Sequence, residues 1–330
     1  YIGGSLALQG HKVVFIEKPE TAEELSRRGL RLQVDQEKRI LASPEMSGSL
    51  QAALMKGPFD LALFAVKSYD TQSAVEALTP FADRLPPVLS FQNGVENEAL
   101  IASVLGPEKV IAGTVTSAIG RRATGDIVLE RLRGIGIAGD HPLSISLAGA
   151  LNEAGLNARL YANAADMKWS KMLTNLLANA SSAILDMTPS EIFNHPGLFR
   201  LEIRQLREAL RVMHALNIHI VDLPGTPVRM LAFGVQGLPP QVLRPLMKNA
   251  VGGGRGGKMP SFFIDLRERK GRSEVDYLNG AVVRFGEQAG VPTPANRLLN
   301  ETLLALTDGR LPLDTFRRQP EKLLKRLQSK

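Results

Sequence analysis

Three polar residues, Lys171, Asn175 and Asn179, recur at intervals of four in the second half of the chain. In an α-helix this spacing turns each side chain only about 40° from the previous one, so the three form a polar stripe. Nearly all positions between them are apolar, and a lysine on a largely buried helix needs a partner or a polar cavity to offset its lost hydration. The stripe is therefore predicted to face a cleft, where its ammonium and amides meet a ligand. The alternative is the exposed edge of an amphipathic helix.

A carboxylate partner for this lysine is available in a later segment, where Glu274 and Asp276 follow Ser273. We predict that Ser273 caps a helix, which places Glu274 in the first turn. An acid there also stabilises a helix without any other role, because its charge interacts favourably with the helix dipole. Ser261, which follows Pro260, is likewise an ordinary cap candidate. Both the catalytic and the structural interpretation of these residues stay open.

Polar residues also follow two apolar segments in the first half of the chain. Lys67 comes directly after the segment 61–66, and Asn93 and Gly94 follow the segment 88–91. Taken singly, these are common turn residues. In an open α/β sheet, however, ligands bind beyond the carboxyl ends of the strands, so Lys67 and Asn93 are predicted to converge on one cofactor.

The first twenty residues contain glycines and a charged pair that bear on cofactor binding. Gly3 and Gly4 either contact a phosphate or are the small residues at which a helix packs on a sheet. Glu17 ends an apolar strand, where an acid accepts hydrogen bonds from an adenosine ribose, whereas Lys18 would receive a 2′-phosphate; simple solvent exposure is the third interpretation. The glycine fingerprint of dinucleotide-binding proteins is not in the chain, so we expect a fragment that begins after it.

Two kinds of hydrophobic periodicity divide the chain near residue 161. Before it, apolar runs typical of buried strands alternate with helical segments. Three later runs are predicted to complete the same sheet: 110–118, 126–130 and 134–138. Helical periodicity then extends over 164–184, 196–216, 273–288 and 295–306, and the glycine-rich stretch 252–258 is predicted to be a flexible loop. We predict an α/β Rossmann-type, doubly wound domain over 1–161, lacking its first strand and glycine loop, and an all-α substrate domain over 162–330.

Composition limits the classes of function. Of the 330 residues, 44% are hydrophobic and 22% charged, which is typical of a folded globular protein. No apolar run approaches the roughly 18 residues of a spanning helix, so no membrane partner is expected. The net charge of +7 suits an anionic substrate, but with 5% aromatic residues and no binding motif we expect no nucleic acid. The chain has no cysteine and its histidines lack metal-ligand spacing, so we expect no metal and a cytoplasmic protein.

In combination these residues resemble the ketopantoate reductase family, also called 2-dehydropantoate 2-reductases. The segment 1–7 (YIGGSLA) is similar to the segment directly after the family's glycine fingerprint, and 169–179, which begins Trp-Ser-Lys, is similar to its catalytic helix. Three later blocks are similar to family signatures: 256–261 (GGKMPS), 273–280 (SEVDYLNG) and 290–294 (GVPTP). They follow the family's order over nearly the whole chain, so the resemblance is more specific than any single motif.

The resemblance implies a second domain like that of 6-phosphogluconate dehydrogenase relatives and an active site between the two domains. Lys171 would donate a proton to the C2 oxygen of a small anionic 2-keto acid while hydride arrives from nicotinamide C4. Glu274 would hydrogen-bond this lysine, the new hydroxyl or the cofactor ribose. The implied substrate contacts are Asn93, Asn175, Asn179 and Ser261. The implied cofactor contacts are Gly3, Glu17, Lys18, Lys67, Asn93 and Glu274.

The resemblance further implies pantoate as product, in pantothenate biosynthesis, and NADPH (NADP) rather than NADH (NAD) as cofactor. Members usually carry a basic residue near position 18, although Glu17 would repel a 2′-phosphate and keeps NADH open. A homodimer is compatible with the sequence. Two alternatives remain: a reductase of another small 2-keto acid or an imine, and a catalytically idle nicotinamide-binding sensor.

Overall fold

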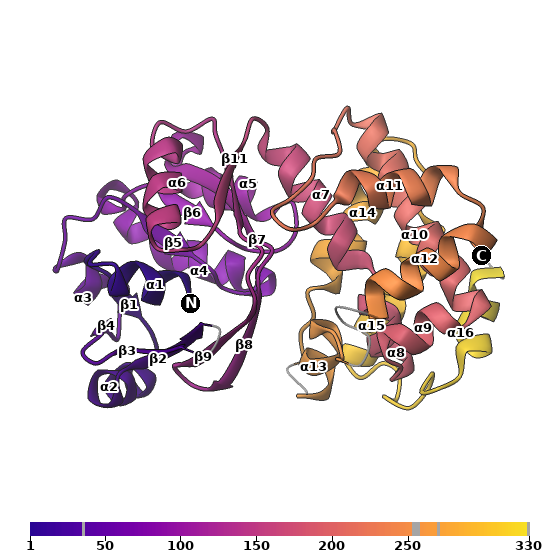
Figure 1. Cartoon of the computed structure of the whole chain (residues 1–330), viewed down its shortest axis with the longest axis horizontal. Helices are drawn as coiled ribbons and strands as arrows, with labels where there is room; N and C mark the ends of the chain where they lie inside the picture. The colour runs from indigo at the N-terminus through magenta and orange to yellow at the C-terminus, as the bar shows by residue number, and fades with distance from the viewer. Residues whose placement is uncertain (35–36, 253–257, 269–270, 329–330) are drawn as a thin grey trace.

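Every strand that the structure describes lies in the first 161 residues, and the elements after them are helices. The computed structural model describes residues 1–34, 37–252, 258–268 and 271–328, so most of the predicted glycine-rich loop lies outside the described residues. The strand-containing part and the helical part lie side by side (Figure 1). The prediction of a Rossmann-type α/β domain followed by a helical one is confirmed.

Five strands form the main sheet, in the order β11-β10-β7-β6-β5. Their bounds are β5 (Ala62–Phe64), β6 (Val88–Ser90), β7 (Val110–Val115), β10 (Ile135–Ala138) and β11 (Ala158–Tyr161). β5, β6 and β7 are parallel, whereas β10 is antiparallel to β7 and parallel to β11. The carboxyl ends of the three parallel strands therefore lie at one edge of the sheet, where ligands bind in open α/β folds.

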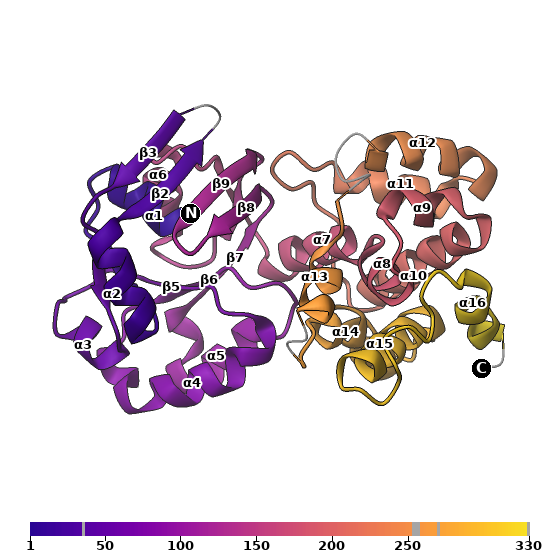
Figure 2. The ribbon, with the colours of Figure 1, turned by 90° about the horizontal axis from the view of Figure 1, so that it is seen from below.

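Helices cover both faces of the main sheet because its strands are apolar on both. Leu89 and Ile111, each fully buried, pack with α6 (Ser144–Glu153) on one face. Val88 packs with α4 (Thr71–Leu78) and α5 (Asn97–Leu105) on the other. Since successive residues of a strand point to opposite faces, β6 contributes to both layers. Figure 2 shows α4 and α5 on one side of these strands and α6 on the other.

The remaining strands form two smaller sheets. β1 (Val14–Ile16) pairs in parallel with β4 (Glu45–Ser47). The other four pair in the order β3-β2-β9-β8: β2 (Leu30–Val34), β3 (Glu37–Leu41), β8 (Ala118–Ala123) and β9 (Asp126–Arg131). The prediction that 126–130 completes the main sheet is therefore wrong, because this run forms β9 of the four-stranded sheet. β9 buries Leu129 but exposes Glu130 and Arg131, a pattern that suits a sheet with one solvated face rather than a strand buried on both faces.

Short helices fill the first half between these strands. They are α1 (Ile2–Leu8), α2 (Pro19–Arg28) and α3 (Leu50–Leu54), with single 3-10 segments at Ser68–Asp70, Thr79–Arg84 and Pro107–Lys109. α1 lies against β2 at Gly4, where a Cβ atom would approach Leu30 Cδ2 to 2.8 Å and Leu32 Cδ1 to 2.9 Å. Gly4 is therefore a packing glycine, one of the two interpretations that the sequence allowed.

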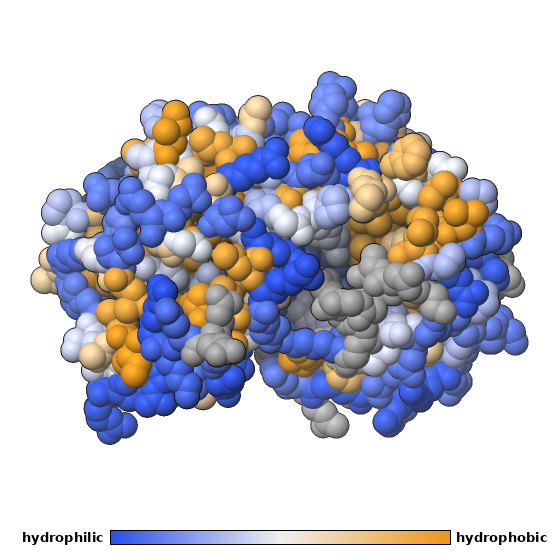
Figure 3. Space-filling view, viewed as in Figure 1, coloured by the Kyte–Doolittle hydropathy of each residue, from blue (hydrophilic) through white to orange (hydrophobic). Residues whose placement is uncertain are grey.

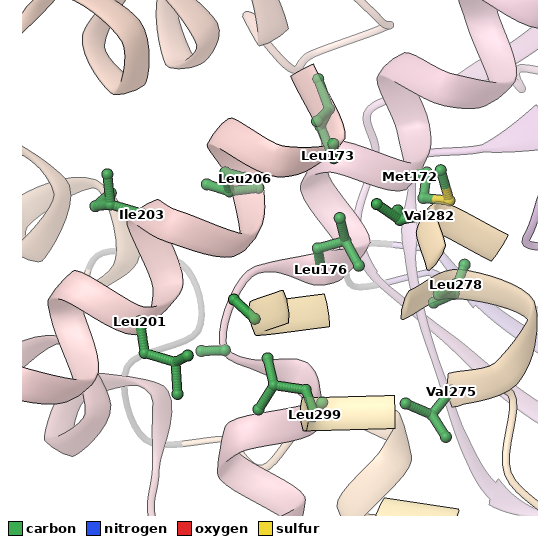
Figure 4. Close-up of a cluster of buried hydrophobic side chains, with 14 of the residues drawn as sticks. Met172, Leu173, Leu176, Leu201, Ile203, Leu206, Val275, Leu278, Val282 and Leu299 are labelled. Atoms are coloured by element: carbon green, nitrogen blue, oxygen red, sulfur yellow. The ribbon is translucent and has the colours of Figure 1, made fainter. Parts of the chain in front are cut away.

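The helical part is built around α10 (Pro196–Ala215), which packs against α7, α14, α15 and α16. The other helices are α7 (Ala164–Leu176), α8 (Asn179–Leu185), α9 (Pro189–Asn194), α11 (Val228–Gly237), α12 (Pro240–Gly252), α13 (Ser261–Arg267), α14 (Val275–Gln288), α15 (Pro294–Thr307) and α16 (Pro320–Gln328). Figure 4 shows Leu176 of α7, Leu206 of α10, Leu278 of α14 and Leu299 of α15 converging in one apolar core. This core holds α7 against the other helices.

The single helix predicted over 164–184 is two helices. α7 ends at Leu176, and Ala178 adopts the left-handed conformation with φ 50° and ψ 18° before α8 begins at Asn179. The residues of this break are apolar and carry no proline or glycine, so local periodicity gives no sign of it. Its cause is non-local, because the buried carboxylate of Glu202 on α10 accepts the backbone N–H of Ala178 at 2.7 Å.

α7 crosses from the sheet into the helical part, and Lys168 anchors its first half. The Lys168 Nζ atom donates to the carbonyl oxygens of Gln92 at 2.6 Å and Gly113 at 3.3 Å, and to Glu98 Oε1 at 2.7 Å. Its side chain is 5% exposed, so this ammonium is satisfied almost entirely by the protein. Glu98 lies on α5, four residues after Gly94. The contacts of Lys168 therefore lie beside the carboxyl end of β6.

The face shown in Figure 3 is mostly hydrophilic, with apolar residues gathered in small areas. One such area lies on α11 and α12, where Met230, Phe233, Val242 and Leu246 are each at least half exposed. Among the helices of the described residues, none combines the length and apolarity needed to cross a membrane.

Replacing Lys168 by Met tests whether this buried ion pair joins the two parts. We expect the free energy of unfolding in urea to fall by about 3–5 kcal/mol, because Glu98 and two carbonyl groups lose their cation in a buried place. The matched control is Arg297→Met, which breaks the exposed pair with Glu287 and is expected to cost less than about 1 kcal/mol. Equal losses in the two variants would contradict the anchoring role.

Candidate functional site

The loops after β5 and β6 meet, as the sequence predicts for Lys67 and Asn93. Ser68, next to Lys67, donates its Oγ hydrogen to the carbonyl oxygen of Asn93 at 2.8 Å. Asn97 Nδ2 donates to the same carbonyl at 2.6 Å, so the Asn93 backbone is held by two side chains. The two strand ends thus present one lysine and one amide side by side.

Gly94 lets this loop touch the helical part. Its φ of +90° lies in the region that favours glycine, and a Cβ atom would come within 2.9 Å of the carbonyl oxygen of Tyr277. Any larger residue at position 94 would therefore push the loop away from α14. The Asn-Gly pair acts here as a contact between the two parts of the chain as well as a turn.

Glu274, directly before α14, is paired with the β5 loop. Its carboxylate is 3% exposed, and its Oε2 atom accepts Lys67 Nζ at 2.9 Å. Its Oε1 atom accepts the Ser68 backbone N–H at 3.3 Å and lies 3.2 Å from the Ser68 hydroxyl oxygen. The predicted Glu274 therefore lies at the junction, in contact with a residue predicted to bind the cofactor.

Asp265 is a member of this cluster that the sequence did not single out. Its Oδ2 atom accepts Lys67 Nζ at 3.1 Å, and the residue is 4% exposed on α13. An acid inside the apolar run Phe262 to Leu266 was the available signal, since acids are rarely buried without a partner. Lys67 thus bridges two buried carboxylates that belong to two different helical segments.

The charge balance at Lys67 favours its ionised form. Burial acts to lower the pKa of Lys67, but the attraction and hydrogen bonds of Glu274 and of Asp265 outweigh it, so the pKa is raised above 10.5. A group whose folded pKa is raised contributes stability below its unfolded pKa and loses it only as the pH rises through the folded value. The bridge is therefore fully formed at neutral pH.

Two residues of the predicted stripe on α7 lie at the same junction. Lys171 is partly buried, one turn before Asn175, which is 8% exposed. Asn175 Nδ2 donates to Asn93 Oδ1 at 2.9 Å. α7 therefore brings the turn that carries Lys171 next to the loop after β6.

Asn179 lies on α8 and not on the same helix as Lys171, which corrects the predicted geometry of the stripe. Its Nδ2 atom donates to the carbonyl oxygen of Asn175 at 3.2 Å, and its Oδ1 atom accepts the backbone N–H of Phe262 at 3.2 Å. Ser261, the residue before Phe262, is exposed as the first residue of α13. The two asparagines stay adjacent, but the helix break turns the second one toward α13.

The residues predicted to hold the adenosine end of a cofactor lie apart from this cluster in the fold. Glu17 and Lys18 are exposed after β1, which belongs to the two-stranded sheet rather than to the main sheet. Lys18 also precedes α2 as its N-cap residue. Gly3 is partly buried, and a Cβ atom there would lie 3.0 Å from Phe15 Cε1 on β1.

A Rossmann-type α/β domain, a helical second domain and a polar cluster where strand ends meet the helices define a class of two-domain nicotinamide-dependent oxidoreductases. The chain belongs to the ketopantoate reductase family within this class. The family model described as ketopantoate reductase PanE/ApbA matches residues 1–141, and the model of its C-terminal part matches residues 163–307. The resemblance stated from the sequence is confirmed.

Individual relatives agree with this assignment. A 2-dehydropantoate 2-reductase of Pyrococcus horikoshii is 25% identical over 303 residues, which cover 90% of each chain. The crystal structure of a PanE/ApbA family ketopantoate reductase from Ralstonia eutropha JMP134 is similar with a TM-score of 0.78 and 28% identity, over 94% of this chain and 95% of that one. D-mandelate dehydrogenase, solved with NADH and anilino(oxo)acetate, shares the fold with a TM-score of 0.74 and 21% identity over 93% and 94%.

Replacing Lys67 by Met tests the charge balance of the cluster. Glu274 and Asp265 would lose the cation that their buried carboxylates share. We expect the free energy of unfolding in urea to fall by about 1–3 kcal/mol, because two buried acceptors lose a charged donor. Lys38→Met, at an exposed lysine of β3, serves as control and should change the free energy of unfolding by less than about 0.5 kcal/mol. Equal losses in the two variants would refute this account.

Proposed function

We propose that this chain reduces 2-dehydropantoate (ketopantoate) to pantoate, with a nicotinamide cofactor as reductant. The observation that carries this proposal is the contact of Asn175 with Asn93, which sets the turn bearing Lys171 beside the carboxyl edge of the main sheet. In open α/β folds that edge is where a dinucleotide lies. Membership of the ketopantoate reductase family gives the substrate class.

The residues present suit the two ends of a dinucleotide, one on the two-stranded sheet and one on the main sheet. Exposed Glu17 and Lys18 after β1 offer an acceptor for ribose hydroxyls and a cation for a phosphate. Lys67, Ser68 and Asn93 after β5 and β6 offer an ammonium, a hydroxyl and an amide at the inner end. When bound, the reduced cofactor supplies the hydride that is added to C2 of the keto acid.

The chain's own residues then bind the keto acid and supply the proton. As hydride reaches C2, negative charge develops on the C2 oxygen, and the Lys171 ammonium stabilises that charge and transfers its proton to the oxygen. Asn175, Asn179 and Ser261 hold the carboxylate and the hydroxyl of the substrate. The products are pantoate, the oxidised cofactor and neutral Lys171, which regains a proton from solvent.

Glu274 acts at the boundary between substrate and cofactor. Its carboxylate is oriented by Lys67 and Ser68, so it is available as an acceptor at a fixed position. We assign to it a hydrogen bond to the new hydroxyl, to the cofactor ribose or to Lys171. In the last of these roles the carboxylate favours the charged form of Lys171 that the reaction needs.

NADPH is our proposed cofactor, in slight preference to NADH. Lys18 would pair with the 2′-phosphate, whereas the neighbouring Glu17 repels it and favours a free 2′-hydroxyl. The fold neighbour D-mandelate dehydrogenase was solved with NADH. The same neighbour supports a second candidate function, the reduction of a different small 2-keto acid by the same chemistry.

Replacing Lys171 by Ala tests the proton donor. We expect kcat to fall at least about a hundredfold, because the developing alkoxide loses its general acid. The measurement is cofactor oxidation at 340 nm with ketopantoate and a panel of branched 2-keto acids, and Lys38→Ala is the lysine control. Full activity of the Lys171→Ala variant would exclude this mechanism. A higher kcat/KM of the wild-type protein for another acid of the panel would identify that acid, and not ketopantoate, as the substrate.

Replacing Lys18 and Glu17 by Ala in turn tests the cofactor assignment. Lys18→Ala should raise the KM for NADPH about tenfold and leave that for NADH unchanged, since one charge-assisted hydrogen bond to a phosphate is lost. Glu17→Ala should shift the ratio of kcat/KM values toward NADPH. If both variants keep the wild-type ratio, these residues do not contact the 2′ position.

A further inference from the structure

The break between α7 and α8 is a strained point in the described backbone. Ala178 is a buried alanine in the left-handed conformation, which is sterically unfavourable for an L-residue with a side chain. Such conformations persist only where the surroundings fix them, and they concentrate at functional sites. Here the break separates the helix of Lys171 and Asn175 from that of Asn179.

Glu202 on α10 supplies the acceptors that fix the far side of the break. Its Oε2 atom accepts the backbone N–H of Ala178 at 2.7 Å, and its Oε1 atom accepts the hydroxyl of Ser181 at 2.6 Å. Both atoms lie in a residue with no exposed surface. The carboxylate thus holds the first turn of α8 directly.

Gln205, one turn further along α10, fixes the near side. Its Nε2 atom donates to the carbonyl oxygen of Leu176, the last residue of α7, at 3.1 Å, and to Glu202 Oε2 at 2.6 Å. Two of the backbone groups that the break leaves without helical partners, the Ala178 N–H and the Leu176 carbonyl, are therefore bound by side chains of α10. The side chains of Glu202 and Gln205 are hydrogen-bonded to each other, and together they contact both ends of the break.

A carboxylate suits the surroundings of Glu202, although its burial is unfavourable. All three groups around Glu202 are donors: a backbone N–H, a hydroxyl and an amide NH₂. Burial nevertheless raises the pKa of Glu202 to about 7, while these hydrogen bonds act to lower it. An apolar residue at this position could accept none of these three hydrogen bonds.

We propose that Glu202, with Gln205, is a positioning residue that sets where Asn179 stands relative to Lys171 and Asn175 across the keto acid. This inference rests on the proposed function. Asn179 also accepts the backbone N–H of Phe262 at the start of α13, so a shift of the break would displace Ser261 as well. Glu202 itself, buried beneath the break, touches neither substrate nor cofactor.

The variants Glu202→Ala and Glu202→Gln separate this role from simple burial. Glu202→Ala leaves the donors of Ala178, Ser181 and Gln205 without their acceptor, and we expect kcat/KM for the keto acid to fall about ten- to a hundredfold, largely through KM. The KM for the cofactor should change less than about twofold, because the strand ends are untouched. Glu202→Gln should stay within about threefold of wild type, since its amide oxygen can accept from Ala178 while its NH₂ donates to a reversed Ser181 hydroxyl.

Glu208→Ala is the matched control. Glu208 lies on the same helix, has no exposed surface and also accepts three hydrogen bonds, but these come from Ala295 and Asn296 at the start of α15. We expect a comparable loss of unfolding free energy with less than about a threefold change in the KM for the keto acid. If the two alanine variants lose keto acid affinity in proportion to stability, Glu202 is merely structural and the proposal fails.

Amide hydrogen exchange provides a readout that does not depend on activity. In Glu202→Ala the amides of residues 176–181 should exchange faster than in wild type, whereas in Glu208→Ala the faster exchange should appear at residues 293–298. Unchanged exchange at 176–181 in Glu202→Ala would overturn the proposal. Wild-type protein that reduces no 2-keto acid would instead contradict the proposed function, and the exchange data would still decide whether Glu202 holds the break.

Discussion

Buried polar groups must find their partners, and this requirement fixes how the two parts of the chain meet. Glu274 finds Lys67 and the backbone of Ser68, and Asn175 finds Asn93. Each of these pairs has one member on a strand end and the other in the helical part. An apolar interface of the same size could slide by a residue without great cost, whereas these pairs are satisfied only in one relative position. The junction therefore trades some stability for a defined geometry at the strand ends.

That geometry could be predicted in part from the sequence, because parallel strands end at one edge and helical spacing groups residues on one face. Lys67, Asn93, Asn175 and Glu274 were found in this way together with the family resemblance. The break at Ala178 could not be found, since its cause lies on α10, in contacts that have no local signature. The pairing of β9 with β2 could not be found either, because it depends on which sheet leaves the polar face of β9 exposed to solvent.

Asp265 shows a different limit. A single acid in an apolar helical run carries a weak signal, because the same pattern describes an acid on the edge of an amphipathic helix. Only the meeting of α13 with the β5 loop shows that its partner is Lys67. Two carboxylates on one lysine keep the ammonium charged and in place. A cofactor at this edge would thus meet a cation whose orientation is already set.

Lys171 lies between two anchors of α7, and this placement has a mechanical consequence. Lys168 ties the helix to the sheet one turn before it, and Asn175 ties it to the Asn93 loop one turn after it. Over these two turns the helix is fixed to the strand ends by polar contacts and to the other helices by the apolar core that contains Leu176. α13 is tied to the same strand ends, because Asp265 pairs with Lys67. The proposed proton donor and the residues proposed to hold the keto acid therefore stand on helices that share their anchors at the carboxyl edge of the sheet, which limits how far these residues can shift relative to one another.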